Sequence, residues 1–204
     1  MANFFDKYEL YTEGDSVYCY KGTCVLKNKF GIKNIDLLRQ AETELVFAAM
    51  LELELEPIKG NFDKEHLYDI HRFLFSNIYD FAGKTRTEDI SKGSTKFCVY
   101  HYITENMDKL FATVKEKEKG IKRREDVIDF FSFLMAELNI IHPFREGNGR
   151  AIREYIREYA SALGYNIDWS KVDKEYLLDS MIKSVFDLAE LKECLNKVTF
   201  NKNR

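Results

Sequence analysis

One short segment of this 204-residue chain gathers most of the side chains that could do chemistry. It reads His142-Pro143-Phe144-Arg145-Glu146-Gly147-Asn148-Gly149-Arg150. His142 is a candidate general base, because an ordinary imidazole has a pKa near neutrality. Glu146 offers hard carboxylate oxygens of the kind that magnesium takes together with phosphates. The segment therefore predicts a base and a metal ligand close together in the chain.

The same segment has the types of residue that bind a phosphate. Gly147 and Gly149 allow backbone conformations and close approaches that side chains would block. A helix predicted to start near Asn148 would present free backbone amides, which bind anions with help from the helix dipole. Three arginines follow at helical spacing and could fork onto further phosphate oxygens: Arg150, Arg153 and Arg157. Together these features predict a polyphosphate site with an activated nucleophile beside it.

Each of these residues, taken alone, has a simpler structural explanation. A histidine beside a proline is usually a loop residue, and Gly-Asn-Gly is a common turn. Arg150 and Glu154 have the spacing of a surface ion pair, while Arg153 and Arg157 could face water. The combination favours the functional interpretation, because an ordinary surface turn has no reason to combine all of them. A P-loop is excluded, since Gly83-Lys84-Thr85 has Ile78 where that motif requires a glycine.

The elements that must position this segment are predicted to be helices. The chain has 2 prolines and 10 glycines, whereas average usage would give roughly 10 and 14. A helix from about 126 to 141 is apolar nearly all round, which places it at the centre of the fold. It should end at His142, directly before Pro143. A second helix should run from near Asn148 to Gly164, so the chemistry lies in the sharp loop between the two.

Further helices and one hairpin complete the predicted fold. One helix should begin at Asn34 and end at Pro57, with its apolar face at Leu37, Leu38, Ala41, Leu45, Ala48 and Ala49. The next should begin at Asp63 and end before Gly83, with Leu67, Ile70, Leu74, Ile78 and Phe81 inward. Residues 86–99 suit a short hairpin that turns at Lys92-Gly93. Helices are also expected over 104–119 and after the caps Asp173 and Asp187. The predicted organisation is an N-terminal arm, 1–33, followed by one globular unit, 34–204.

Composition excludes several classes of protein. A net charge of -3 gives no electrostatic footprint for nucleic acid. The most apolar stretch, 127–138, is interrupted by two acidic residues and is too short to span a membrane. The N-terminus has no secretory signal pattern, and the four scattered cysteines indicate free thiols in a reducing compartment. We therefore expect a cytoplasmic protein that binds neither nucleic acid nor a membrane, and the histidine spacing predicts no zinc.

The segment from His142 to Arg153 resembles the signature of the Fic family, His-x-Phe-x-Asp/Glu-Gly-Asn-Gly-Arg-x-x-Arg, without departure at any defined position. The resemblance covers most of the chain, from about residue 20 to 199. Val25 to Ile32 looks like the N-terminal segment of bacterial Fic toxins. Residues 78–87 resemble the family's approach to its flap, and Lys92-Gly93-Ser94-Thr95-Lys96-Phe97-Cys98 resembles the flap itself. The resemblance implies the Fic fold, a helical bundle around a buried central helix with a short β-hairpin flap.

The resemblance also implies an AMP transferase with ATP as substrate and Mg²⁺ as cofactor. His142 would deprotonate a hydroxyl of a target protein, whose oxygen would attack the α-phosphate of ATP while pyrophosphate leaves. Glu146 would position magnesium, and Phe144 would anchor the loop as an apolar plug. The nucleotide would be held by the amides of Gly147, Asn148 and Gly149 on the α-phosphate and by Arg150 and Arg153 on the β- and γ-phosphates.

The flap residues would align the target's segment by strand addition. Their alternative role, a hairpin that merely covers the core, is equally compatible with the sequence. The residues assigned to the flap are Lys92, Gly93, Ser94, Thr95, Lys96 and Phe97. By resemblance to related toxins, the expected targets are type II topoisomerase subunits.

The chain lacks a motif that regulates many Fic proteins. Many Fic proteins carry an inhibitory helix with the pattern Ser/Thr-x-x-x-Glu-Gly/Asn, whose glutamate pairs with the arginine that is Arg153 here. Glutamate followed by glycine or asparagine occurs only at Glu13, Glu105 and Glu146, and none has Ser or Thr four residues earlier. This absence resembles the toxin branch of the family. We therefore predict a small antitoxin protein that supplies the inhibitory glutamate.

Two other functions remain open at this stage. The enzyme could transfer a different part of a nucleotide, such as UMP or a phosphate. The kinase-like Doc branch departs from the signature at the second glycine, so the intact Gly149 argues against a phosphate. Alternatively, the fold could be a catalytically silent binding module, although no residue of the signature is missing.

Overall fold

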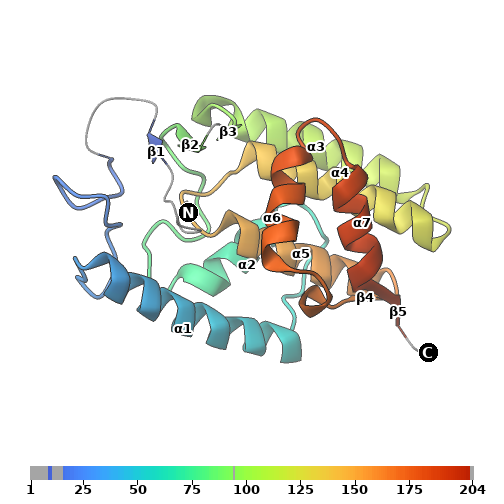
Figure 1. Ribbon diagram of the computed structural model, residues 1–204, viewed down its shortest axis with the longest axis horizontal. Helices are drawn as coiled ribbons and strands as arrows, with labels where there is room; N and C mark the ends of the chain where they lie inside the picture. The colour runs from blue at the N-terminus through green and yellow to red at the C-terminus, as the bar shows by residue number, and fades with distance from the viewer. Residues whose placement is uncertain (1–8, 11–15, 94, 203–204) are drawn as a thin grey trace.

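The computed structural model describes residues 9–10, 16–93 and 95–202. Its helices are α1 (Ile35–Leu55), α2 (Lys64–Phe75), α3 (Ile103–Glu118), α4 (Arg124–Ile141), α5 (Asn148–Ala162), α6 (Lys174–Lys183) and α7 (Ala189–Val198), with the 3-10 turns η1 (Tyr100–Tyr102) and η2 (Trp169–Lys171). Strands β1 (Glu9–Leu10), β2 (Ile90–Lys92) and β3 (Thr95–Lys96) form one antiparallel sheet, and β4 (Tyr165–Ile167) pairs with β5 (Thr199–Asn201). The predicted mostly helical fold with a short hairpin is confirmed (Figure 1).

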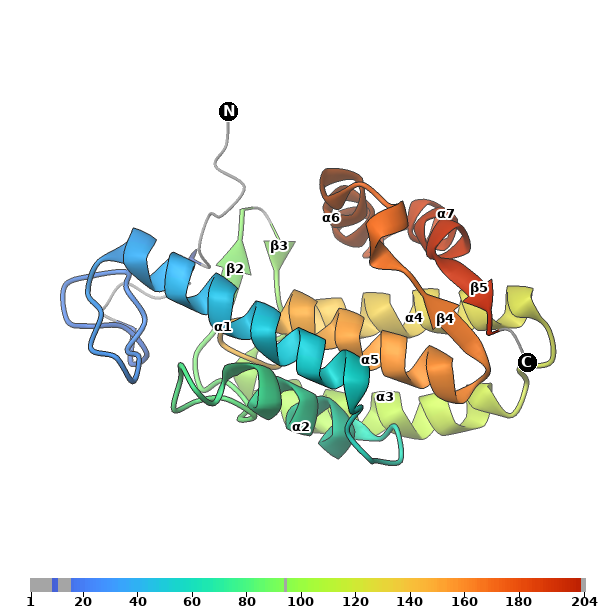
Figure 2. The same ribbon diagram turned by 90° about the horizontal axis from the view of Figure 1, so that it is seen from below.

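The helices on either side of the chemically interesting loop form the centre of the fold. α5 packs against both α2 and α4, and α4 also packs against α3 and α7. Figure 2 shows α6 and α7 on one face of the α4–α5 pair and α2 and α3 on the other. Phe131 and Leu134 of α4 are completely buried, as are Ala151 and Tyr155 of α5. The prediction of a buried central helix that ends directly before His142 is confirmed.

Side-chain caps fix the starts of several helices where the sequence predicts them. The Asn34 side chain accepts hydrogen bonds from the amides of Asp36 and Leu37 at 2.9 and 3.0 Å, and Asp63 caps α2. Asp173 caps α6 in the same way. Such caps satisfy amides that have no partner within the helix. These local bonds determine where the helices that surround the site begin.

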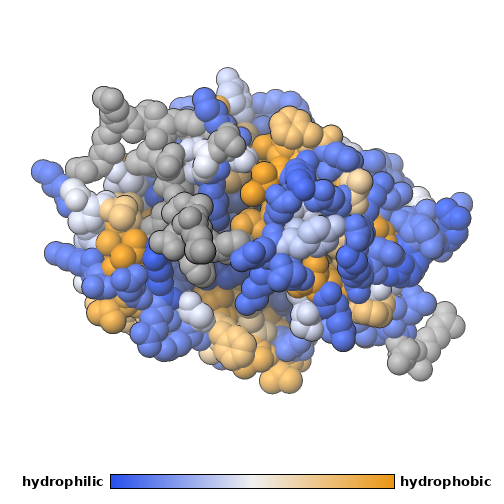
Figure 3. Space-filling model, in the orientation of Figure 1, coloured by the Kyte–Doolittle hydropathy of each residue, from blue (hydrophilic) through white to orange (hydrophobic). Residues whose placement is uncertain are grey.

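The predicted inward face of α1 is partly wrong. Leu37 is 58% exposed and Ala48 is also exposed. The residues that α1 buries form a narrower stripe, Leu38, Val46, Ala49 and Leu53. The reason is that α1 covers the rest of the fold from outside, so only one side of the helix finds neighbours. Figure 3 shows apolar side chains gathered along the edge of the molecule where α1 lies.

The second helix is shorter than its apolar pattern predicts. α2 ends at Phe75, and the chain continues in a tight turn in which the amides of Ile78 and Tyr79 both donate to the Phe75 carbonyl at 2.9 Å. Ile78 is nevertheless completely buried, from the turn rather than from the helix. A helical periodicity that continues into a buried turn cannot reveal where the helix stops.

The hairpin is confirmed and is shorter than the predicted 86–99. β2 and β3 pair with Ser91 opposite Lys96 and turn at Gly93, whose φ is +55°. β1 pairs with the other edge of β2, with Leu10 opposite Ile90. In the described part of the chain, no helix is long and apolar enough to cross a membrane.

Candidate active site

The loop 142–147 joins α4 to α5 through a left-handed residue. His142 has φ +49° and ψ 62°, and its amide donates to the Leu138 carbonyl at 2.9 Å as the last bond of α4. The following Pro143 disfavours a right-handed helical backbone at His142, and non-glycine residues rarely adopt positive φ. The backbone therefore turns sharply at the residue that the sequence assigns as the base.

The imidazole of His142 is held as one neutral tautomer. Its Nδ1 lies 2.9 Å from the Asn139 carbonyl oxygen, which can only accept, so Nδ1 carries the proton and Nε2 the lone pair. The ring stacks on Phe97 with centroids 3.7 Å apart. Burial, with a smaller effect from the charges of Arg86 and Lys92, lowers the pKa of His142 to about 3. The prediction of a pKa near neutrality is wrong, because the ring is desolvated, but a neutral ring is the form that a base requires.

Asn148 closes the loop with its side chain. Its Oδ1 accepts from the Phe144 amide at 2.9 Å, and its Nδ2 donates to the Phe144 carbonyl at 2.7 Å. Asn148 and Phe144 are both completely buried. Sequence reasoning gave Asn148 a backbone role and missed this clamp. The signal was available, since an amide side chain offers both the donor and the acceptor that a short loop needs.

His71 of α2 binds the backbone of the loop, a contact that sequence reasoning missed. Its Nδ1 accepts from the Gly83 amide at 2.8 Å, so the proton is on Nε2, which donates to the Glu146 carbonyl at 2.8 Å. The ring also stacks on Phe144 with centroids 3.8 Å apart. Burial lowers the pKa of His71 to about 3. The available signal was a polar residue on the inward face of a helix, between Leu67 and Leu74.

Gly147 and Gly149 stand at the start of α5, where the backbone comes close to other groups. Gly147 has φ +80°, and a Cβ atom there would lie 2.3 Å from the ring of Phe75. A Cβ on Gly149 would lie 3.3 Å from the guanidinium of Arg153. The amides of Asn148 and Gly149 precede the first carbonyl-bonded turn of α5, whereas the Arg150 amide donates to the Gly147 carbonyl at 3.1 Å. In this structure the Gly147 amide donates to Glu146 Oε1 at 2.9 Å.

The structure brings two of the three predicted arginines to this helix start. Arg150 Nη2 lies 2.6 Å from Glu42 Oε1 and 3.5 Å from Glu146 Oε1. Arg153 lies against Gly149, and burial together with the charge of Arg150 lowers its pKa to about 10, so the guanidinium is charged at neutral pH.

Arg157 does not extend this group. It donates to the Leu53 carbonyl at 3.1 Å and pairs with Glu154, so it ties α5 to the end of α1. The predicted continuation of the arginine face is wrong at Arg157, because a neighbouring helix end offers that guanidinium a carbonyl oxygen. The simpler pairing of Arg150 with Glu154 is not formed either, since Arg150 pairs with Glu42 of α1.

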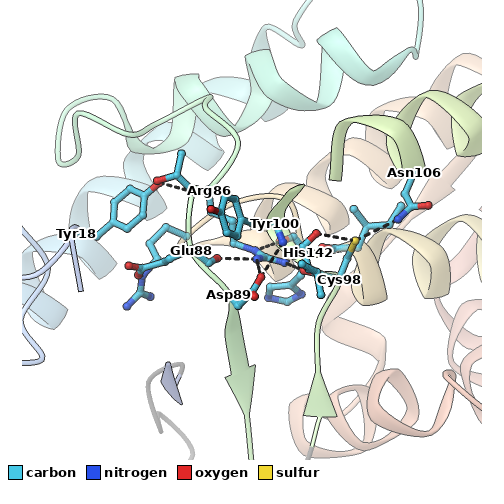
Figure 4. A network of polar contacts seen from close by, with 12 residues as sticks. Tyr18, Arg86, Glu88, Asp89, Cys98, Tyr100, Asn106 and His142 are labelled. Carbon is cyan, nitrogen blue, oxygen red and sulfur yellow. Dashed lines mark hydrogen bonds and ion pairs between the residues drawn. The ribbon is translucent and has the colours of Figure 1, made fainter. Parts of the chain in front are cut away.

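Arg86 connects the flap to the loop, and Figure 4 shows it between the two. This 1% exposed guanidinium donates to the carbonyls of His142 at 2.9 Å, Glu88 at 2.7 Å and Cys98. Its backbone amide donates to the Pro143 carbonyl at 2.9 Å. Glu88, in turn, accepts from Arg145 Nε at 2.7 Å. The sequence placed Arg86 in the approach to the flap without indicating this role.

The predicted flap residues lie in or next to the hairpin. Lys92 ends β2 and pairs with Thr95, Gly93 follows in the turn, Thr95 and Lys96 form β3, and Phe97 follows with its ring on His142. Ser94 lies outside the described residues. The Cys98 amide donates to the Ile140 carbonyl at 2.9 Å, which ties the end of the hairpin to α4.

The residues at the loop fit magnesium better than zinc or calcium. Glu146 has a carboxylate that is 20% exposed beside the start of α5. In the described residues, no three His, Cys, Asp or Glu side chains form a group that could hold a metal ion. Magnesium is usually held by one or two carboxylates with waters and substrate phosphates, rather than by an all-protein cage. A single hard carboxylate next to the predicted phosphate site meets that requirement.

Comparisons with known proteins agree with this geometry. The Fic/DOC family model matches residues 61–160. The chain is 35% identical over 184 residues to the probable protein adenylyltransferase y4lH of Sinorhizobium fredii, covering 89% of this chain and 94% of that protein. It is 34% identical over 199 residues to the protein adenylyltransferase VbhT of Bartonella schoenbuchensis, covering 95% of this chain and 41% of VbhT. The chain thus spans about two fifths of VbhT and nearly all of y4lH.

Solved structures resemble the chain over most of its length. The N-terminal Fic domain of a Bep effector from Bartonella quintana, with bound ADP, has a TM-score of 0.83 at 29% identity and covers 91% of this chain and 95% of that one. BepC from Bartonella tribocorum, with bound AMPPNP, has a TM-score of 0.82 at 25% identity and covers 91% and 97%. Several of the similar proteins are thus named as adenylyltransferases, which are nucleotidyltransferases, or were solved with an adenine nucleotide.

Proposed function

Because this chain belongs to the Fic/DOC family, we propose that it is a protein adenylyltransferase that transfers AMP from ATP to a hydroxyl side chain of a target protein. One observation carries the proposal. A neutral imidazole with its lone pair on Nε2 stands at one end of a loop whose other end is the start of a helix flanked by two arginines. This arrangement combines a general base with an anion site, as an attack on a phosphate requires.

In the proposed reaction, the target hydroxyl oxygen bonds to the α-phosphorus of ATP. The bond from that phosphorus to the oxygen bridging the β-phosphate breaks, and pyrophosphate leaves. The hydroxyl proton passes to Nε2 of His142. Phosphates bound at the start of α5 add negative charge near the imidazole, which favours its protonated form and raises its basicity from the low value in the nucleotide-free protein.

The remaining residues bind and orient the nucleotide. The amides of Gly147, Asn148 and Gly149 would hold the α-phosphate, and Arg150 and Arg153 would hold the β- and γ-phosphates. Glu146 would hold magnesium, which neutralises phosphate charge when bound. Phe144 would keep the loop anchored through its stack on His71. Phosphoryl-type transfer depends chiefly on such positioning and charge stabilisation.

The hairpin would hold the target segment by strand addition. β1 already pairs with one edge of β2 in this structure, so the outer edge of β3 is the one that we assign to the target. β3 runs directly into Phe97, whose ring lies on His142. A segment paired with Thr95 and Lys96 would therefore pass next to the base.

Regulation by a separate protein forms part of the proposal. The inhibitory motif is absent from the sequence, so a separate antitoxin would have to supply the inhibitory glutamate and place it beside Arg153. This association would take place in the cytoplasm. A buried arginine that remains charged is a strong partner for such a carboxylate. Co-purification of the chain with a small protein from its native source would support this part, and an inhibitory glutamate found within the chain itself would contradict it.

The decisive experiment uses ATP labelled at either the α- or the γ-phosphate. The protein is incubated with candidate targets, type II topoisomerase subunits first, and with a His142→Ala control. Transfer of the α-label that disappears in the control supports AMP transfer, whereas transfer of the γ-label would refute it. Absence of transfer from any nucleotide, UTP included, would favour a binding module instead.

A further inference from the structure

A second carboxylate reaches the proposed phosphate-binding arginine from a helix that sequence reasoning left out of the site. Arg150 Nη2 lies 2.6 Å from Oε1 of Glu42, in α1, and 3.5 Å from Oε1 of Glu146. The Glu42 side chain is 15% exposed and that of Arg150 is 25% exposed. At this length and burial, the contact with Glu42 is a charge-assisted hydrogen bond rather than a solvent-screened surface pair.

Glu42 is itself held in place. Its Oε2 accepts a hydrogen bond from the hydroxyl of Tyr79, a side chain that is 1% exposed. Burial and the neighbouring Glu42 charge raise the pKa of Tyr79, so the hydroxyl stays a donor. With Oε2 fixed by Tyr79, Oε1 is directed at Arg150, whose guanidinium also lies 4.8 Å from the centre of the Phe75 ring. The position of the Arg150 side chain is thus set by Glu42 of α1 and by two buried aromatic residues, Tyr79 and Phe75.

Arg150 has a competing partner in Glu146. The two residues are four apart at the start of α5, a spacing that allows them to pair. A guanidinium seated on the Glu146 carboxylate would repel a cation that approaches the same oxygens. The contact of Arg150 with Glu42 is the shorter of the two, and it prevents Arg150 from forming an equally short ion pair with Glu146.

We propose that Glu42 is a positioning residue of the nucleotide site: it retains Arg150 and thereby leaves the Glu146 carboxylate available to magnesium. The inference rests on the proposed function, since ATP and magnesium are its ligands. It concerns a residue outside the signature segment and makes α1 part of the active site. Glu42 touches neither the nucleotide nor the metal in this proposal, because it acts through Arg150.

The test measures binding of the non-hydrolysable analogue AMPPNP by calorimetry while magnesium is titrated, without any target protein. Glu42→Gln keeps the size of the side chain and an acceptor for Tyr79 but removes the charge that retains Arg150. We expect the half-saturating magnesium concentration to rise about tenfold, the size expected for losing a hydrogen bond between charged groups. Glu52→Gln, at an exposed position of the same helix, is the matched control and should change nothing.

Two further variants separate positioning from a general structural effect. Tyr79→Phe keeps the ring and removes the hydroxyl, so it should shift the magnesium dependence in the same direction by a smaller factor. Arg150→Met removes the competitor for Glu146, so adding Glu42→Gln to it should produce no additional shift. At saturating magnesium, labelled-AMP transfer by Glu42→Gln should keep its kcat within about threefold of the wild type, since the reacting groups are unchanged.

The outcomes are distinct. An unchanged magnesium dependence in Glu42→Gln, an equal shift in the presence and absence of Arg150, or tighter nucleotide binding would each overturn this inference while leaving the proposed function intact. Failure of the wild type to bind AMPPNP with magnesium would overturn the proposed function and this inference with it.

Discussion

Gly147→Ala is the substitution for which the structure gives the most definite expectation. The new methyl group would lie 2.3 Å from Cζ of the buried Phe75, whereas ordinary contacts begin at 3.4 Å. The loop, the ring, or both must therefore retreat by about 1 Å. The alanine must also adopt φ +80°, which costs about 1–2 kcal/mol for an L-residue. Overpacking against Phe75 adds about 1–3 kcal/mol.

The matched control for this change is Gly164→Ala, at the other end of the same helix. Gly164 has φ +87°, but a Cβ atom there meets nothing within 4 Å. The stability of Gly164→Ala should fall only by the conformational cost of the positive φ, which is about 1–2 kcal/mol, or about 2–8 °C in Tm. The difference in Tm between the two variants then measures the clash with Phe75 alone.

Activity should separate the two variants more strongly than stability does. A displacement of about 1 Å at reacting groups lowers rates by about 100-fold, so α-label transfer by Gly147→Ala should fall by about that factor. Gly164→Ala should keep near wild-type transfer. Differential scanning fluorimetry and the labelled-ATP assay provide both quantities. If Gly147→Ala retained more than a tenth of wild-type activity, the close packing of the loop on Phe75 would not be what positions the phosphates.

Three other predictions address the proposed metal ligand, the buried histidines and the flap. Glu146→Ala should abolish magnesium-dependent transfer, and full activity in that variant would refute its role as ligand. Burial lowers the pKa of both His71 and His142 to about 3, against about 6.5 in the unfolded chain. Between these pH values the unfolded chain therefore binds more protons than the folded protein, so the free energy of unfolding, measured in urea, should fall as the pH drops from 6.5 towards 3. The fall should be less steep in His71→Gln. A free energy of unfolding that rises on acidification would contradict this reasoning. Arg86→Met leaves several buried carbonyls without their donor, at about 1–3 kcal/mol each, and should reduce AMP transfer more than AMPPNP binding; equal losses would argue against a role in the flap.

The helical framework could be predicted because its signals are local. Asn34 and Asp63 each cap the helix that follows them, and Pro143 stops α4 where the sequence says it must. The signature segment likewise indicated which residues belong to the loop. The end of α2 could not be predicted, because the buried turn after Phe75 continues the apolar spacing of the helix.

The residues that hold the loop could not be found in the same way. His71 lies 75 residues from the carbonyl it binds, Arg86 lies 56 residues from His142, and Glu42 lies 108 residues from Arg150. No local pattern encodes contacts at such separations, since they arise only when the helices pack. The low pKa of His142 has the same origin, because the ring is buried and is covered by Phe97 at the end of the hairpin.

These distant residues share one function, which is to bind the carbonyl oxygens of the loop. Arg86 binds the carbonyls of His142 and Pro143, Asn148 binds that of Phe144, and His71 binds that of Glu146. A carbonyl oxygen carries partial negative charge and would repel a phosphate, whereas an amide attracts it. Because these donors satisfy the carbonyls within the protein, a phosphate at the start of α5 would meet the amides of Asn148 and Gly149 rather than the carbonyls of the loop. In the proposed nucleotide complex, the glycines would permit a phosphate to come close, and the donors from α2, α5 and the approach to the flap would determine which polar groups it meets.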